Sequence, residues 1–204
     1  MKKLIPLIFL SCLMSFSNAI FAQEYISVLE NYKNRSAIYD YSEKYLNNTD
    51  TIPDFDSKPN KLKISGIIYQ SDGVTPAKDV ILYVSQPDEN GDFQMKRDEH
   101  RKRYVHHQGW IKTDADGRYT LYTFMPGKYL YAKELKKIHR VIKEPGKPEY
   151  EINSFFFNDD PLIPELTLAC RAQAIPSMLR LEKEGDMLVA IKDIKLNKSI
   201  KDFQ

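Results

Sequence analysis

Short runs of β-branched and aromatic residues, separated by turn residues, dominate the chain from Lys61 onward. The first run, Lys61–Tyr69, begins with strict polar–apolar alternation, and Val80–Val84 is continuously apolar and aromatic, as in a strand buried on both faces. Further runs cover residues 110–113, 118–124, 128–131, 138–143, 150–157, 179–181 and 187–196. Turns rich in Gly, Pro and Asp separate the runs, and no helical repeat lies between them. This pattern predicts an all-β fold, an antiparallel β-sandwich over residues 61–204.

Residues 23–60 have a different character. Apolar side chains such as Ile26, Leu29 and Ile38 recur at partly helical spacing, which predicts one or two short helices. The end of the segment, residues 47–60, is rich in Asn, Asp and Pro and is interpreted as a linker. A segment of this length is too short for a core of its own, so we expect it to pack on the sandwich.

The first 22 residues are typical of a secretory signal peptide. They begin with the basic Met1–Lys3, continue with an almost wholly apolar stretch, and end on Ala22, a small residue before the expected cleavage point. Such a signal would direct export, to the periplasm or the medium, and would then be cleaved. An uncleaved membrane anchor and a lipidated Cys12 are the alternatives. No later stretch has the ~18 apolar residues of a membrane span, so we expect no span after cleavage.

Charge and cysteine content exclude several classes of protein. Residues 1–22 hold two of the 30 basic side chains and none of the 28 acidic ones, so the mature chain would be formally neutral. Nucleic-acid binding is disfavoured because affinity for phosphates needs a basic face. Cys170 would be the one remaining cysteine, which excludes an internal disulfide framework and predicts a packing residue. The charge is uneven, because residues 23–60 carry an excess of three acidic side chains and Lys96–Arg103 an excess of three basic ones. That basic run is either a solvated loop or a rim that attracts anions.

Motifs for nucleophilic hydrolysis, phosphate cradling and the commonest zinc proteases are absent from the sequence. Asp114–Gly117 lacks the later glutamate of a calcium-binding EF-hand loop, so it predicts a plain β-turn. His106 and His107 follow the basic run. Neighbouring residues on a strand point to opposite faces, so these two histidines could serve one metal only in irregular backbone.

Four ordered segments carry a family resemblance, namely Thr113–Tyr119, Thr123–Tyr129, Ile138–His139 and Phe156–Leu162. In this order they resemble the intradiol ring-cleavage dioxygenases, enzymes of the catechol and protocatechuate type. The resemblance is closer to exported bacterial members of that family, through Ala37–Tyr39, Asn47–Thr51 and Ile142–Lys147. It implies the β-sandwich of the intradiol dioxygenase type with a short N-terminal helical segment.

The resemblance also implies a site. Members of the family hold ferric iron with two tyrosines and two histidines, and they open catechol-type rings with O₂. Phenolate is a hard anionic donor that suits Fe(III), and imidazole completes a site that leaves room for a catecholate. Carried over to this sequence, the second tyrosine is Tyr129 and the second histidine is His139. The other two ligand positions hold Phe93 and Lys137, and the family's arginine is Glu134.

These replacements change what the site can bind. Phe93 has no donor atom, and Lys137 carries an ammonium that cannot coordinate a metal unless it is deprotonated. The site then implies either Fe(III) on Tyr129 and His139 or no cofactor. In the second case the Lys137 ammonium would take the place of the metal beside the Tyr129 hydroxyl.

The leading hypothesis is an exported intradiol dioxygenase-like protein, an oxidoreductase or a pseudoenzyme, whose altered site binds a small aromatic or anionic molecule. One alternative is a non-enzymatic β-sandwich of the transthyretin-like or regulatory kind. Another is an active enzyme whose metal site is rebuilt with His106 or His107. The sequence identifies no substrate, protein partner or oligomeric state.

Overall fold

The computed structural model describes residues 30–128 and 134–197. The expected signal peptide, residues 1–22, and part of the expected strand 128–131 lie outside these ranges. The described residues divide into two compact units. The first comprises residues 30–36 with Arg97–Tyr104, and the second comprises Ala37–Lys96 with the residues from Val105 onward.

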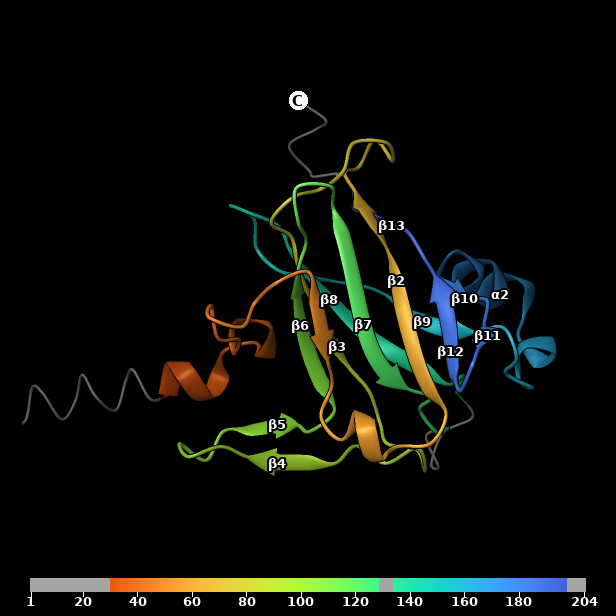
Figure 1. Cartoon of the computed structure of the whole chain (residues 1–204), viewed down its shortest axis with the longest axis horizontal. Coiled ribbons are helices and arrows are strands. Elements are labelled where there is room, and N and C mark those ends of the chain that lie inside the picture. The colour runs from red at the N-terminus through yellow and green to blue at the C-terminus, as the bar shows by residue number, and fades with distance from the viewer. Residues whose placement is uncertain (1–29, 129–133, 198–204) are drawn as a thin grey trace, which may run out of the picture. The chain divides into compact units, whose positions relative to one another are not determined.

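Two β-sheets build the second unit. The first sheet has the order β1 (Thr49–Thr51), β7 (Arg118–Phe124), β2 (Lys61–Tyr69), β12 (Met187–Ile191) and β11 (Glu182–Glu184), with β13 (Ile194–Lys195) paired to β2. The second sheet has the order β10 (Met178–Leu179), β9 (Tyr150–Phe157), β8 (Lys137–Lys143), β3 (Ile81–Ser85) and β6 (Gln108–Lys112). A separate ribbon pairs β4 (Met95–Arg97) with β5 (Arg103–Val105). Figure 1 shows the two larger sheets face to face, which confirms the predicted all-β sandwich.

The strand pairing is mixed. The central pairs β2–β7, β3–β6, β3–β8 and β8–β9 are antiparallel, as predicted. Four short strands pair in parallel instead: β1 with β7, β10 with β9, and both β12 and β13 with β2. The predicted last hairpin is confirmed, because β11 and β12 are antiparallel partners on either side of Gly185.

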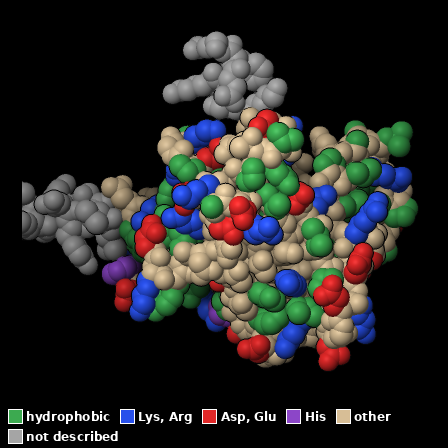
Figure 2. Space-filling view, turned by 45° about the horizontal axis from the view of Figure 1, so that its top comes forward, with side chains coloured by type: hydrophobic (Ala, Val, Ile, Leu, Met, Phe, Trp, Pro, Cys, Tyr) green, Lys and Arg blue, Asp and Glu red, His purple; other side chains and the backbone are tan. Residues whose placement is uncertain are grey.

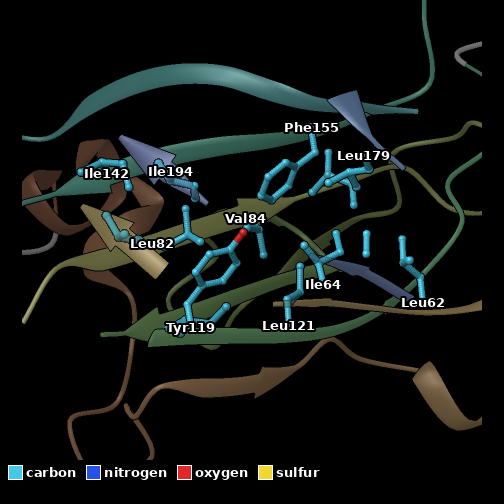
Figure 3. Packing of buried hydrophobic residues seen from close by; sticks show 14 of the residues in the cluster. Leu62, Ile64, Leu82, Val84, Tyr119, Leu121, Ile142, Phe155, Leu179 and Ile194 are labelled. Carbon is cyan, nitrogen blue, oxygen red and sulfur yellow. The ribbon is translucent and has the colours of Figure 1, made fainter. Parts of the chain in front are cut away.

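The core lies between the two sheets, where Figure 3 shows Tyr119 and Phe155 among aliphatic side chains. The alternation of β2 buries Leu62 and Ile64 completely, and every residue of β3 is buried, as the continuous run predicted. Such burial of apolar surface is the main favourable contribution to folding, at about 25 cal/mol per Å².

One charge is buried next to this core. The Arg140 side chain donates to the Asn153 carbonyl and, at 3.0 Å, to the Ser177 hydroxyl, and it stacks 3.8 Å from the centre of the Phe155 ring. A buried guanidinium needs such partners because burying it without them would be very costly.

The segment before β2 combines short helical turns with one strand. In the second unit, the 3₁₀ helix η1 (Ala37–Tyr39) buries Ile38 against Ile81 and Tyr83 of β3, as expected for a segment that packs on the sandwich. A second 3₁₀ helix, η2 (Phe55–Ser57), precedes β2. Strand β1 lies in the stretch expected to be a linker.

The first unit is small. Residues 30–34 are helical, and the Tyr32 hydroxyl donates to the Asp98 carboxylate. The Lys102 ammonium donates to the Arg35 carbonyl at 2.9 Å. These contacts tie part of the basic run to the helical residues next to it, so the basic run is not a wholly solvated loop.

The largest departure from the sequence-based expectation follows β9. Helix α2 (Leu168–Ala174) lies there between the 3₁₀ helices η3 (Ile163–Glu165) and η4 (Ile175–Ser177). Cys170 lies on α2 and is exposed, so its prediction as a packing residue was wrong. The reason is that this helix of seven residues turns most of its side chains to solvent and buries Ala174. In the described ranges, no helix is both long and apolar enough to cross a membrane.

Candidate functional site

A small cavity lies at the start of β8. It has a volume of about 160 Å³, and its described lining residues are Pro87, Phe93, Gly127, Glu134, Leu135, Lys137 and His139. Lys137 and His139 are two positions apart on β8, so the alternation of the strand places them on the same face. The structure therefore brings together Phe93, Lys137 and His139, three of the four positions that the resemblance assigned to one site. The fourth, Tyr129, lies outside the described residues.

Phe93 reaches the cavity from a turn built around Asp88. The Asp88 carboxylate accepts hydrogen bonds from the Asn90 and Asp92 N–H groups at 2.9 and 3.0 Å and from the Gln94 amide at 3.0 Å. Burial alone would raise the pKa of Asp88, but these hydrogen bonds outweigh it and hold the pKa below its ordinary value. The carboxylate is therefore charged at neutral pH and keeps the turn closed.

Gly127 holds the opposite side of this turn. Its N–H donates to the Asp88 carbonyl at 2.8 Å. A Cβ at this position would lie 2.4 Å from the Gly91 nitrogen and 2.5 Å from the Glu89 carbonyl oxygen. Only glycine permits such a close approach of two backbones, so a glycine at position 127 is what lets this segment pack directly on the turn that carries Phe93.

Among the described lining residues, the polar side chains are one ion pair and one imidazole. The Lys137 ammonium contacts the Glu134 carboxylate at 2.5 Å. Burial and the nearby Lys137 ammonium lower the pKa of His139, so its imidazole is neutral at pH 7. The Phe93 ring lies against this imidazole, with ring centres 5.8 Å apart and planes inclined by 47°.

The described residues of the cavity do not fit ferric iron. The Phe93 ring contacts the His139 imidazole but carries no donor atom. Lys137 is an ammonium engaged by Glu134, and deprotonating it would break that pair. His139 is then the one imidazole that the described lining offers, whereas ferric sites of the family use four protein ligands.

His106 and His107 do not line this cavity. They lie in irregular backbone between β5 and β6, which lets both rings approach one group. Their Nε2 atoms are 2.9 Å and 3.4 Å from Oδ2 of Asp54, the residue before η2. Burial lowers the pKa of His107, more than its contact with Asp54 raises it. The hypothesis that these histidines complete the altered iron site therefore lacks support, and they belong to a separate cluster.

Asp54 is the site residue that sequence reasoning missed. It lies in the stretch expected to be a linker, 52 residues from His106. No local pattern marks it, because the pairing depends on how η2 lies against the residues before β6.

Comparisons with known proteins address the fold. No family model matches the chain, and no curated protein matches it in sequence. Among solved structures, the chain is similar to the dioxygenase domain of a dioxygenase–carbohydrate-binding protein fusion from Streptomyces sp. SirexAA-E, at 21% identity over 78% of this chain and 94% of that one, with a TM-score of 0.60. It is also similar to an intradiol ring-cleavage dioxygenase from Tetranychus urticae, at 17% identity over 78% and 92% of the two chains, with a TM-score of 0.59.

A third similar structure is 3-chlorocatechol 1,2-dioxygenase from Rhodococcus opacus 1CP, at 19% identity over 78% of this chain and 70% of that one, with a TM-score of 0.56. The motifs quoted from the sequence and these structures point to the same architecture by independent routes. The chain has the fold of the intradiol ring-cleavage dioxygenases.

Proposed function

We propose that the cavity at the start of β8 binds a single-ring aromatic anion, such as a benzoate, and that it does so without ferric ring-cleavage chemistry. The observation that carries this proposal is the meeting of Phe93, Lys137 and His139 in one cavity of about 160 Å³. An apolar cavity of about 150 Å³ in another protein holds benzene, so this volume suits one aromatic ring.

The lining supplies the chemistry that such a ligand needs. Phe93 and Leu135 offer apolar surface to a ring. The Lys137 ammonium offers a cation to a carboxylate, and Glu134 neutralises that cation while the cavity holds no anion. The neutral His139 imidazole can donate or accept one further hydrogen bond. This combination favours an aromatic carboxylate over a neutral aromatic of the same size.

Calorimetric titration with benzoate and with toluene tests the proposal. We expect benzoate to bind more tightly, and we expect Lys137→Met to remove that preference. Glu134→Gln should strengthen benzoate binding, because the ammonium then has no competing carboxylate. The matched control is Lys136→Met, since Lys136 pairs with Asp159 at 3.6 Å and does not line the cavity. Equal benzoate affinities for the parent protein and Lys137→Met would contradict the proposal.

A ferric titration separates this function from ring cleavage. We expect no visible phenolate-to-iron charge-transfer band from the parent protein, because Phe93 and Lys137 replace two ligands. The double variant Phe93→Tyr with Lys137→His should gain the band, because it would supply a phenol and an imidazole at two positions that line the same cavity as His139. The parent protein would instead be a ring-cleaving enzyme if it bound stoichiometric iron with this band and consumed oxygen when catechol was added.

We further propose that the protein is exported, on the strength of the basic start and apolar stretch of residues 1–22. Cell fractionation with mass measurement of the mature N-terminus tests this. A protein that keeps Met1 in the cytoplasm would contradict it.

A further inference from the structure

Asp54, His106 and His107 form a compact cluster with the ligand types of a transition-metal site. Their potential ligand atoms, one carboxylate oxygen and two imidazole nitrogens, all lie within 4.8 Å of one another. The Asp54 Oδ2 atom is 2.9 Å from His106 Nε2 and 3.4 Å from His107 Nε2. In tetrahedral zinc sites with bonds of 2.0–2.1 Å, neighbouring ligand atoms are about 3.3 Å apart. The two separations from Asp54 are thus already close to those that a bound metal requires, and the third is within 4.8 Å.

Hydrogen bonds within the cluster cannot satisfy both neighbours of His106 at the same time. His106 Nε2 has the Asp54 carboxylate oxygen at 2.9 Å and the Lys96 ammonium nitrogen at 3.0 Å. One ring nitrogen can donate to the carboxylate or accept from the ammonium, but it cannot do both. A cation bound by lone pairs of His106 and by Asp54 would satisfy both groups at once.

The His107 ring presents Nε2 to the cluster. Its side chain is 0% exposed, and Nε2 lies 3.4 Å from the Asp54 Oδ2 atom. The neutral imidazole with its proton on Nδ1 leaves the Nε2 lone pair available to a metal. Nδ1 itself has no hydrogen-bond partner among the described residues, and metal binding at Nε2 would not supply one.

Two of the three groups are held in place independently of any metal. The His107 ring packs edge-on against Phe124 at 5.0 Å, and its backbone carbonyl accepts from the Gln86 N–H at 3.0 Å. Asp54 has φ of 66°, in the left-handed region, and its carbonyl accepts from the Ser57 N–H at 3.0 Å and the Ser57 hydroxyl at 2.9 Å. Ligands that are ordered beforehand lose little entropy when a metal binds.

We propose that Asp54, His106 and His107 bind one divalent transition metal of the zinc class. Two imidazoles with one carboxylate form a ligand set that zinc accepts readily, and three protein ligands leave a fourth position for water or another small ligand. The exposed Lys96 side chain competes with the metal for His106 and must swing away on binding. The site is separate from the aromatic-anion cavity, so neither proposal depends on the other.

Calorimetric titration of the purified protein, free of any histidine tag, with Zn²⁺ tests the site. We expect one zinc per chain with micromolar or tighter affinity. Asp54→Asn should weaken binding at least tenfold while keeping a residue that tolerates the left-handed backbone. His106→Gln should do the same. Lys96→Gln should strengthen binding, because it removes the competing cation.

The control is His100→Gln, which removes an exposed histidine that is not part of the cluster. Titration with Co²⁺ gives a second readout, because visible d–d absorption reports the ligand set directly and should be lost in Asp54→Asn and His106→Gln. Circular dichroism confirms that each variant is folded. Failure of the parent protein to bind Zn²⁺ at millimolar concentration would overturn the proposal, as would equal affinities in the parent protein and in both ligand variants.

Discussion

Substitution of Thr113 tests how much one buried hydroxyl group contributes to the stability of the sandwich. It directly follows β6, and its hydroxyl accepts from the Val80 N–H at 2.9 Å and donates to the Ala77 carbonyl at 2.6 Å. Thr113→Val keeps the shape of the side chain but leaves both backbone groups without this partner. Each orphaned buried group costs about 1–3 kcal/mol, and the added methyl group returns about 1 kcal/mol. For two such groups we therefore expect the free energy of unfolding to fall by about 1–5 kcal/mol.

Urea unfolding followed by circular dichroism measures this loss. With an m-value of about 2 kcal/mol per molar, the midpoint should fall by about 0.5–2.5 M while the slope stays unchanged. The control is Thr120→Val, because Thr120 is a half-buried threonine on β7 without that buried contact. A loss below about 0.5 kcal/mol for Thr113→Val, or one equal to that of the control, would refute the assignment of these two hydrogen bonds as stabilising.

Three further predictions concern turns and exposed groups. Gly127→Ala should destabilise the protein by about 1–3 kcal/mol and weaken benzoate binding, because the new methyl group would collide with the backbone of the turn at Gly91. Urea unfolding and benzoate titration measure these two effects, and an unchanged stability and affinity would contradict the close approach. The pKa of Asp72 is lowered to about 2, mainly by the Thr75 hydroxyl. Its stabilising effect is therefore complete above the ordinary carboxyl pKa and is lost as pH falls from about 4 to about 2. The stability difference between the parent protein and Asp72→Ala should shrink over that interval, and a constant difference would contradict this. Because Cys170 is exposed, it should react with a thiol reagent in the native protein as fast as in urea. Cys170→Ser is the control, and slower reaction of the native protein would contradict this exposure.

The strands of the fold were predictable because their polar and apolar residues follow the burial of each strand. The alternation at the start of β2 matches its burial, and the continuous apolar run matches the complete burial of β3. Helix α2 was missed for the opposite reason, since its first residue, Leu168, is 84% exposed and gives no pattern of one buried face. The parallel pairing of β12 with β2 depends on tertiary register and leaves no local trace.

The candidate site was predictable in part. The alternation of β8 is enough to place Lys137 and His139 on one face, but only the family resemblance linked them to Phe93, which is remote in sequence. The cluster with Asp54 could not be anticipated, because a single aspartate in an irregular stretch has no periodicity. Such a residue is recognised only when the fold brings it to the two histidines.

The two proposed sites use lysine in opposite ways, which allows one kind of substitution to separate them. At the cavity, Lys137 is held on β8 in an ion pair with Glu134, and its ammonium is the attractive group for an anion. At the cluster, the exposed Lys96 ammonium lies where a metal would contact His106, so it opposes binding. Neutralising Lys137 should weaken binding of benzoate and leave zinc affinity unchanged. Neutralising Lys96 should strengthen zinc binding and leave benzoate affinity unchanged. If each of the two substitutions weakened benzoate binding and strengthened zinc binding alike, a general effect of net charge would explain the data better than two distinct sites.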